Sequence, residues 1–183
     1  MSWLRADWYF TGYRCQKVAK ENGKGWTRIY IYEGEYYGYG NEGEDCRKVK
    51  CGYAVFGAWI LLAYLSAAFS NAAGNKIAYI GVTFLIALLP LLYLAAGLIC
   101  ALLQKKKMTY RGYCVSYKRI QRSAKFMIGI LCIPLLLEGI FLMNNQAFLA
   151  QGSEIRFLGS MLLCMAGLIF LLIFMKKKRC QIL

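Results

Sequence analysis

The fold is decided by residues 77–103, IAYIGVTFLIALLPLLYLAAGLICALL, and by the segment after them, residues 104–125, QKKKMTYRGYCVSYKRIQRSAK. The first stretch has no charged residue over 27 positions, and about 20 helical residues are enough to cross the hydrocarbon core of a bilayer. Its length and the proline near its centre, Pro90, are compatible with a tilted or kinked helix. The second stretch carries eight Lys or Arg and no Asp or Glu. This pattern is typical of a transmembrane helix that ends on the cytoplasmic side.

Three further apolar stretches have the length of a membrane span. They cover residues 53–70, 126–143 and 157–175, and the only charged residue among them is Glu138. Because hydrocarbon offers no hydrogen bonds to the backbone, each stretch has to form a helix, which satisfies its peptide groups internally. We therefore predict an all-α integral membrane bundle of four transmembrane helices over residues 51–183, with spans at about 53–70, 77–103, 126–143 and 157–175.

The distribution of positive charge predicts the orientation of this bundle. Of the 183 residues, 59% are hydrophobic and only 17% are charged, yet the net charge is +14. Twenty-one of the 23 Lys and Arg lie before the first span, between the second and third, or after the fourth, and the other two are Lys76 and Arg156. Positively charged flanks stay in the cytoplasm. We expect a multi-pass protein of a bacterial inner (plasma) membrane, with cytoplasmic N- and C-termini.

Residues 1–50 differ from the rest of the chain and predict a small cytoplasmic β module that ends in a glycine-rich linker. Residues 8–17 and 26–33 are rich in Tyr, Trp, Ile and Thr, as strands are. Between them, Asn22-Gly23 provides a tight-turn signal. A third short strand is expected at residues 35–39, giving a two- or three-stranded β-meander. Because such a sheet is marginal alone, we expect it to pack against the membrane face or a partner.

The loop at residues 104–125 predicts an amphipathic cytoplasmic helix. Apolar side chains recur at helical spacing from Tyr113 to Ala124, and basic side chains occupy much of the other face. Such a helix is suited to lying in the membrane interface, where each basic residue contributes about 1 kcal/mol of attraction to anionic headgroups. The charges can equally serve only to set the topology. The residues expected to contact lipid or a partner are Lys105, Lys106, Lys107, Arg111, Lys118, Arg119, Arg122, Lys125, Tyr113 and Tyr117.

Glu138 is the main candidate for an intramembrane polar site. A carboxyl group inside a span is costly, and such residues usually face the bundle interior and mark a pathway or a pairing partner. Pro134, four residues earlier, removes a backbone donor and loosens the same helix. Arg156 and Lys76 lie at the same expected membrane face and have side chains long enough to reach Glu138. Three interpretations stay open: a structural polar clamp, a transport or ligand site, and a protonated bystander.

The sequence offers no motif for catalysis, a cofactor or a metal. There is no histidine, and Cys46 and Cys51 do not have the spacing of a redox or zinc motif. The first 50 residues carry 9 basic and 7 acidic residues, which is too balanced for nucleic-acid binding. The ending Cys180-Gln-Ile-Leu also fits a prenylation signal, which would require a eukaryotic cytosol.

Small residues four apart in the first span, such as Ala54 and Ala58, predict close helix packing within the bundle or with another subunit. Together these patterns favour a non-enzymatic accessory or scaffold subunit of a larger membrane assembly. Its partners would be the bilayer, anionic headgroups, and another membrane protein or further copies of itself. The alternative is a small oligomeric transporter or channel with Glu138 lining the pathway.

Overall fold

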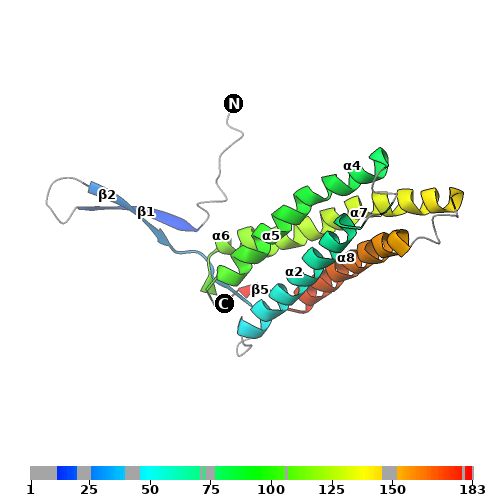
Figure 1. The fold of residues 1–183 in the computed structure, drawn as a ribbon. Helices are drawn as coiled ribbons and strands as arrows, with labels where there is room; N and C mark the ends of the chain where they lie inside the picture. Colours follow the sequence, from blue (N-terminus) through cyan, green and yellow to red (C-terminus); the bar gives the residue numbers. More distant parts are fainter. Residues whose placement is uncertain are drawn as a thin grey trace.

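A computed structural model of the chain describes residues 12–19, 26–39, 46–70, 72, 77–105, 107–145, 152–178 and 180–182. Four helices in it are long and apolar enough to cross a membrane, and they lie side by side in one bundle (Figure 1). The four candidate spans are Cys46–Ala68, Ala78–Leu103, Tyr110–Asn144 and Gly152–Lys177. A bundle of four helices with the length and apolar composition of membrane spans, as predicted, is therefore confirmed.

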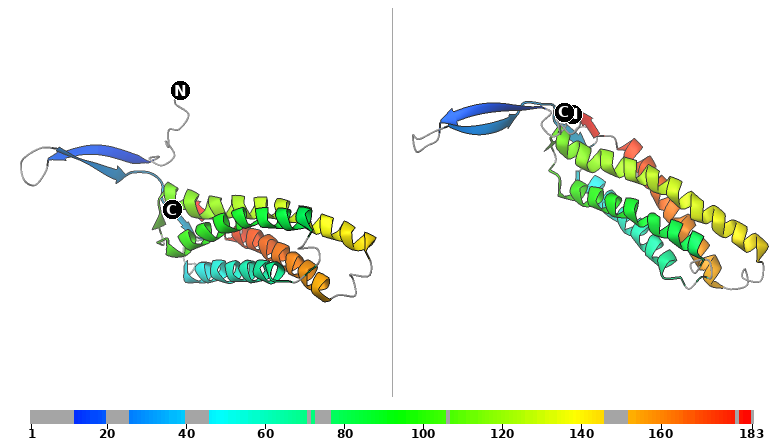
Figure 2. Two further views of the ribbon diagram at one scale, coloured as in Figure 1. Left: turned by 45° about the horizontal axis from the view of Figure 1, so that its top comes forward. Right: turned by 90° about the horizontal axis from the view of Figure 1, so that it is seen from above.

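The bundle consists of two closely packed sides. Helix α2 (Cys46–Ala68) packs most extensively against α8 (Gly152–Lys177). Helices α4 (Ala78–Ile86) and α5 (Leu88–Leu103) pack along α7 (Arg119–Asn144). Both views of Figure 2 show the four spans running alongside one another. The core lies where these two sides meet.

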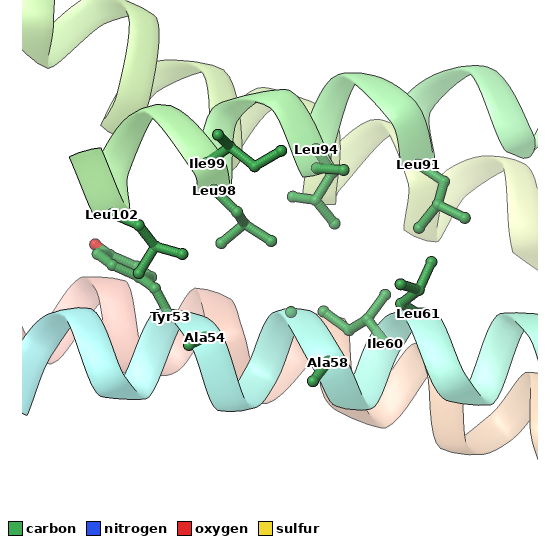
Figure 3. A pocket seen from close by; sticks show the side chains of 12 residues that line it. Tyr53, Ala54, Ala58, Ile60, Leu61, Leu91, Leu94, Leu98, Ile99 and Leu102 are labelled. Atoms are coloured by element: carbon green, nitrogen blue, oxygen red, sulfur yellow. The ribbon is translucent and has the colours of Figure 1, made fainter. Parts of the chain in front are cut away.

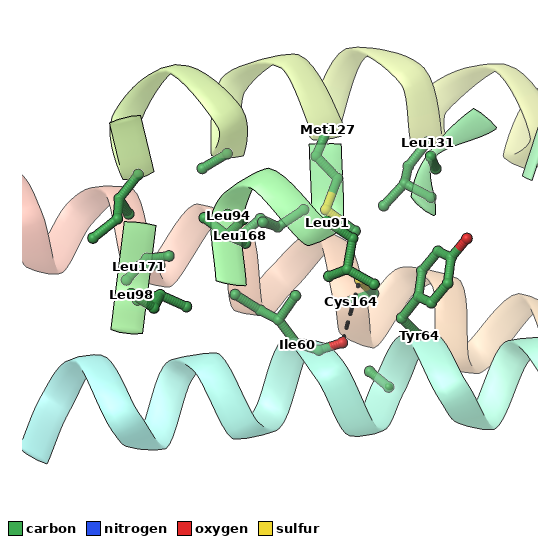
Figure 4. Close-up of a cluster of buried hydrophobic side chains, with 14 of the residues drawn as sticks. Ile60, Tyr64, Leu91, Leu94, Leu98, Met127, Leu131, Cys164, Leu168 and Leu171 are labelled. Atoms are coloured by element: carbon green, nitrogen blue, oxygen red, sulfur yellow. Dashed lines mark hydrogen bonds between the residues drawn. The ribbon is translucent and has the colours of Figure 1, made fainter. Parts of the chain in front are cut away.

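Close approach of α2 and α8 is made possible by small residues. Gly167 of α8 faces Ile60 of α2, and a Cβ atom at Gly167 would lie 3.0 Å from the Ile60 Cγ1 atom. The thiol of Cys164 donates a 3.8 Å hydrogen bond to the carbonyl oxygen of Ile60, and the hydroxyl of Ser160 donates to that of Ser66 at 3.0 Å. Figure 4 shows the surrounding apolar core. Its labelled side chains are Ile60, Tyr64, Leu91, Leu94, Leu98, Met127, Leu131, Cys164, Leu168 and Leu171.

The second span is interrupted at Ala87, three residues before Pro90. Proline has no N–H, so the carbonyl of Ile86 loses the partner that a regular helix would give it. The helix resumes at once, since the N–H of Leu91 donates to the carbonyl of Ala87 at 3.2 Å. The interruption therefore lies where the proline predicts it.

The basic loop is helical from Tyr110 onward, as predicted, but it does not form a helix of its own. Helix α6 (Tyr110–Tyr113), the π-helical segment η1 (Cys114–Lys118) and α7 follow one another without a break. The face that was expected to lie on lipid packs on protein instead, because Tyr117 is buried and its hydroxyl donates to the carbonyl of Met175 at 3.0 Å. Tyr117 therefore belongs to the core and is not a lipid contact.

The strands form two separate sheets. Strands β1 (Tyr13–Ala19) and β2 (Trp26–Tyr32) pair antiparallel in a hairpin that projects away from the bundle (Figure 1). Strand β3 (Tyr37–Tyr39) lies between β4 (Lys107–Met108) and β5 (Cys180–Ile182) in a second sheet. We call the end of the bundle that carries this sheet the sheet end, and the opposite end the loop end.

The predicted third strand is thus present but does not extend the hairpin, so a three-stranded meander is wrong. Its partners come from the loop after the second span and from the chain after the fourth span. Tyr37 of β3 stacks on Tyr113 with ring centroids 4.7 Å apart, and Tyr113 stacks on Tyr117 at 5.3 Å. The hydroxyl of Tyr32 accepts a 2.9 Å hydrogen bond from the N–H of Tyr110. These tyrosines join both sheets to the helices.

Candidate functional site

Two glutamates meet inside the bundle near the loop end. Glu138 of α7 and Glu154 of α8 are both 0% exposed. Glu154 is close enough to Glu138 for the two carboxyl groups to interact electrostatically. Neither oxygen of Glu138 has a hydrogen-bond partner among the described residues. We call Glu138 and Glu154 the acid pair.

The chemistry of the acid pair follows from the closeness of two buried carboxyl groups. An ionised carboxylate only accepts hydrogen bonds, so a hydrogen bond between the two would require a proton on at least one of them. Pro134, also buried, precedes Glu138 by about one turn of α7 and cannot donate a backbone N–H. The arrangement can act as a structural acid–acid contact, or it can exchange a proton or bind a cation.

The partner of Glu138 differs from the one expected. Arg156 is exposed on α8, and no ion pair joins it to Glu138 within the described part of the chain. Lys76 lies outside the described residues, so its pairing stays a prediction. The correct partner was missed because the fourth span was predicted to begin at residue 157, whereas α8 begins at Gly152.

A sequence signal for Glu154 does exist. The most buried residues of α8 recur at alternating spacings of three and four: Glu154, Phe157, Met161, Cys164, Leu168, Leu171 and Met175. Glu154 is the first member of this stripe, three residues before Phe157. Residues at such spacing share one face of a helix, so the apolar face of the span already pointed to Glu154 as an inward side chain.

The basic side chains of the predicted lipid-contact set fall into two groups. Lys118, Arg119 and Arg122 line a pocket of about 270 Å³ at the outer surface of α5 and α7, together with Tyr93, Tyr110, Cys114 and Val115. We call it the basic pocket. Lys105, Lys107, Arg111 and Lys125 are exposed, Tyr113 is half-buried in the tyrosine stack, and Lys106 lies outside the described residues.

A second hollow, the α2–α5 groove, is apolar. It has a volume of about 290 Å³ and is lined from α2 and α5 only. Figure 3 shows the leucines of α5 facing α2, where Ala54 and Ala58 lie on either side of Gly57. Of the small residues of the first span, Ala54 and Ala58 are exposed here, whereas Ala63 and Ala67 are buried in the bundle.

No protein-family model matches this chain, and the searches of curated proteins and of solved structures found no match either. Among the described residues, no group of three or more His, Cys, Asp or Glu side chains is placed to hold a metal ion. The candidate sites are therefore the acid pair, the basic pocket and the α2–α5 groove, each argued from its own geometry.

We predict that Glu138→Gln keeps the stability of the bundle within about 1 kcal/mol, because the amide has the shape of the carboxyl and fills the same space beside Glu154. Glu138→Ala leaves a cavity beside Glu154 and should lower the free energy of unfolding by about 1–3 kcal/mol. The measurement is denaturant or thermal unfolding of the purified protein in detergent. Arg156→Gln is the control and should change stability by less than about 0.5 kcal/mol. An Arg156→Gln effect as large as that of Glu138→Ala would contradict the assigned pairing.

Proposed function

We propose that this protein is a non-enzymatic accessory or scaffold subunit of a larger membrane assembly, which presents the β1–β2 hairpin to a partner protein in the cytoplasm. The observation that carries the proposal is the exposure of the hairpin. Its large apolar side chains are open to solvent, with Trp26 72% exposed. A two-stranded hairpin is marginally stable alone, and exposed strand edges favour pairing with another chain.

The strand register sorts the hairpin side chains onto two faces. Tyr13 opposes Tyr32, Cys15 opposes Tyr30, and Lys17 opposes Arg28. Because side chains alternate along a strand, these six residues and Trp26 share one face, which we call the aromatic face. The opposite face carries Arg14, Gln16, Val18, Thr27, Ile29 and Ile31.

The charges of the aromatic face indicate what it binds. Lys17 and Arg28 are directly opposed across the strands, and like charges in that position destabilise a sheet. On the other face, Arg14 is paired with Glu33 at 3.7 Å. Two opposed cations between exposed aromatic rings favour an acidic segment of a partner, which would remove their repulsion and cover Trp26 and Tyr30.

Within the membrane, the α2–α5 groove supports packing against another transmembrane helix. Small residues at Ala54, Gly57 and Ala58 allow a second backbone to approach closely, which is the usual basis of helix association in lipid. The bundle is then the anchor, and the hairpin is the contact with the cytoplasmic partner. The cytoplasmic placement of the hairpin is supported by the charge distribution, since 21 of the 23 Lys and Arg come before the first span, between the second and third, or after the fourth.

We predict that Trp26→Thr with Tyr30→Thr reduces recovery of the co-purifying partner at least tenfold. The change removes two exposed rings from the aromatic face, and threonine, being β-branched, still favours a strand. The matched control is Ile29→Thr with Ile31→Thr on the opposite face, which should keep the partner. Recovery is measured by mass spectrometry after purification of the full chain in mild detergent. Equal loss in both variants, or a wild-type protein that purifies free of any partner, would contradict the proposal.

The orientation is tested by labelling a single cysteine. Cys15 is exposed on the hairpin, and Asn145 is exposed at the end of α7. In a variant whose other cysteines are replaced by serine or alanine, we expect a membrane-impermeant maleimide to label Cys15 only after the membrane is opened. The same variant with Cys15→Ser and Asn145→Cys should be labelled in intact cells. The reverse pattern would place the hairpin outside and exclude a cytoplasmic partner.

The acid pair favours one alternative of another class, an oligomeric proton- or cation-coupled transporter with Glu138 on the pathway. Two fully buried carboxyls close together are the kind of intramembrane polar group that proton and ion pathways use. The expected result is ion flux in proteoliposomes that disappears in Glu138→Gln, whose fold is retained, and persists in Arg156→Gln. Absence of flux in the wild type removes this alternative and leaves the acid pair as a structural contact.

A further inference from the structure

The basic pocket lies at the expected depth of the lipid headgroups. About 20 helical residues cross the hydrocarbon core. Counted from Ala78, at the loop end of the second span, this length reaches Gly97, and counted back from Asn144 it reaches Lys125. Arg119 and Arg122 therefore lie just beyond the hydrocarbon, and Tyr93 lies just inside it. An aromatic ring at this level and cations above it are typical of a membrane interface.

Arg119 is held in place by helix α5. Gly97 lets the side chain of Arg119 cross α5 closely, since a Cβ atom at Gly97 would lie 3.3 Å from the Arg119 Cγ atom. The guanidinium carbon then lies 4.7 Å from the centre of the Tyr93 ring. Its Nε atom is buried and has no hydrogen-bond partner among the described residues. The guanidinium is thus positioned by the protein with donor capacity left over.

Lys118 is positioned by two tyrosines. Its Nζ donates to the hydroxyl of Tyr110 at 3.2 Å and lies 5.0 Å from the centre of that ring and 5.4 Å from that of Tyr113. Lys118 is the last residue of the π-helical segment η1, and π-helical turns recur at functional sites. An ammonium group has three donors, so the contact with Tyr110 leaves others for a ligand.

No acidic side chain lines the basic pocket. No Asp or Glu occurs between residues 46 and 137, which include every residue that lines it. Three cations thus converge on one hollow of about 270 Å³ whose lining holds no acidic group. Their repulsion is relieved when an anion enters.

We propose that the basic pocket binds the phosphate group of an anionic phospholipid, with Arg119 and Lys118 on its oxygens and Arg122 at the rim. Arginine matches phosphate geometry through paired N–H donors, and lysine adds a compact charge. The exposed Lys105, Lys107 and Lys125 add attraction to the membrane surface without forming a site. The proposal rests on the membrane orientation given above but not on the partner of the hairpin.

The test uses the full chain, purified in a neutral detergent and freed of lipid, and short-chain phosphatidylglycerol as the probe. Binding is measured by native mass spectrometry across a lipid titration. Each of Arg119→Gln and Lys118→Gln should weaken binding about fivefold or more, as expected for one lost cation near a phosphate. Lys125→Gln and Lys107→Gln remove the same charge from exposed positions and should change binding less than twofold.

Two measurements distinguish a loss of lipid binding from misfolding of the variant. Thermal unfolding without lipid shows whether each variant keeps its fold. Arg119→Lys keeps the charge but loses the paired donors, so it should bind between wild type and Arg119→Gln. Equal weakening in the pocket and control variants would overturn the site in favour of diffuse attraction, as would a wild type that binds no phosphatidylglycerol.

The source of the phosphate is decided by soluble probes. Inorganic phosphate and glycerol phosphate, each at tenfold excess over the lipid, should fail to displace phosphatidylglycerol, because they lack the acyl chains that lie beside Tyr93. Displacement by either would overturn the lipid assignment in favour of a soluble phosphate compound. No partner protein is present in this assay. A failure of the lipid proposal is therefore distinguished from a failure of the hairpin proposal.

Discussion

Every peptide group within a bilayer needs a hydrogen-bond partner inside the protein, and the rest of the structure depends on this requirement. It turns four apolar segments into helices, and it restricts irregular backbone to places where the protein supplies replacement contacts. The interruption at Ala87 is an example. The hydroxyl of Tyr64, on the facing helix α2, donates to the carbonyl of Phe84 at 2.8 Å, next to the break. A side chain of one span thus adds a hydrogen bond to the backbone of another, since the N–H of Ala87 also donates to this carbonyl at 3.1 Å.

The two ends of the bundle have opposite chemistry. The loop end holds the acid pair within the apolar interior, and the sheet end holds the basic pocket and most of the exposed cations. Helix α7 carries both features, with Arg119 and Glu138 separated by about five turns. Since α7 follows η1 and α6 without a break, the tyrosine stack, the basic pocket and the acid pair all include residues of one continuous helical segment. A change at one end can be compared directly with a change at the other.

The sequence predicted what depends on composition and missed what depends on distant contacts. Four spans followed from long apolar runs, whereas Pro90 indicated only that the second span is compatible with a tilt or kink. Glu154 was missed because a polar residue at the end of a span weakens the hydropathy signal. It is nevertheless the first member of the buried stripe, three residues before Phe157. The pairing of β3 with β4 and β5 has no local signal at all. Its two- and three-residue partners lie about 70 and 140 positions away, and only the folded bundle brings them together.

The second sheet also sets an order of assembly during synthesis. Strand β3 leaves the ribosome first, β4 follows after two spans have emerged, and β5 emerges only after the fourth. The central strand therefore waits with one edge open until translation has passed Ile182. Completion of this small sheet therefore requires the segment after the fourth span, and it joins that segment to residues before the first span and between the second and third.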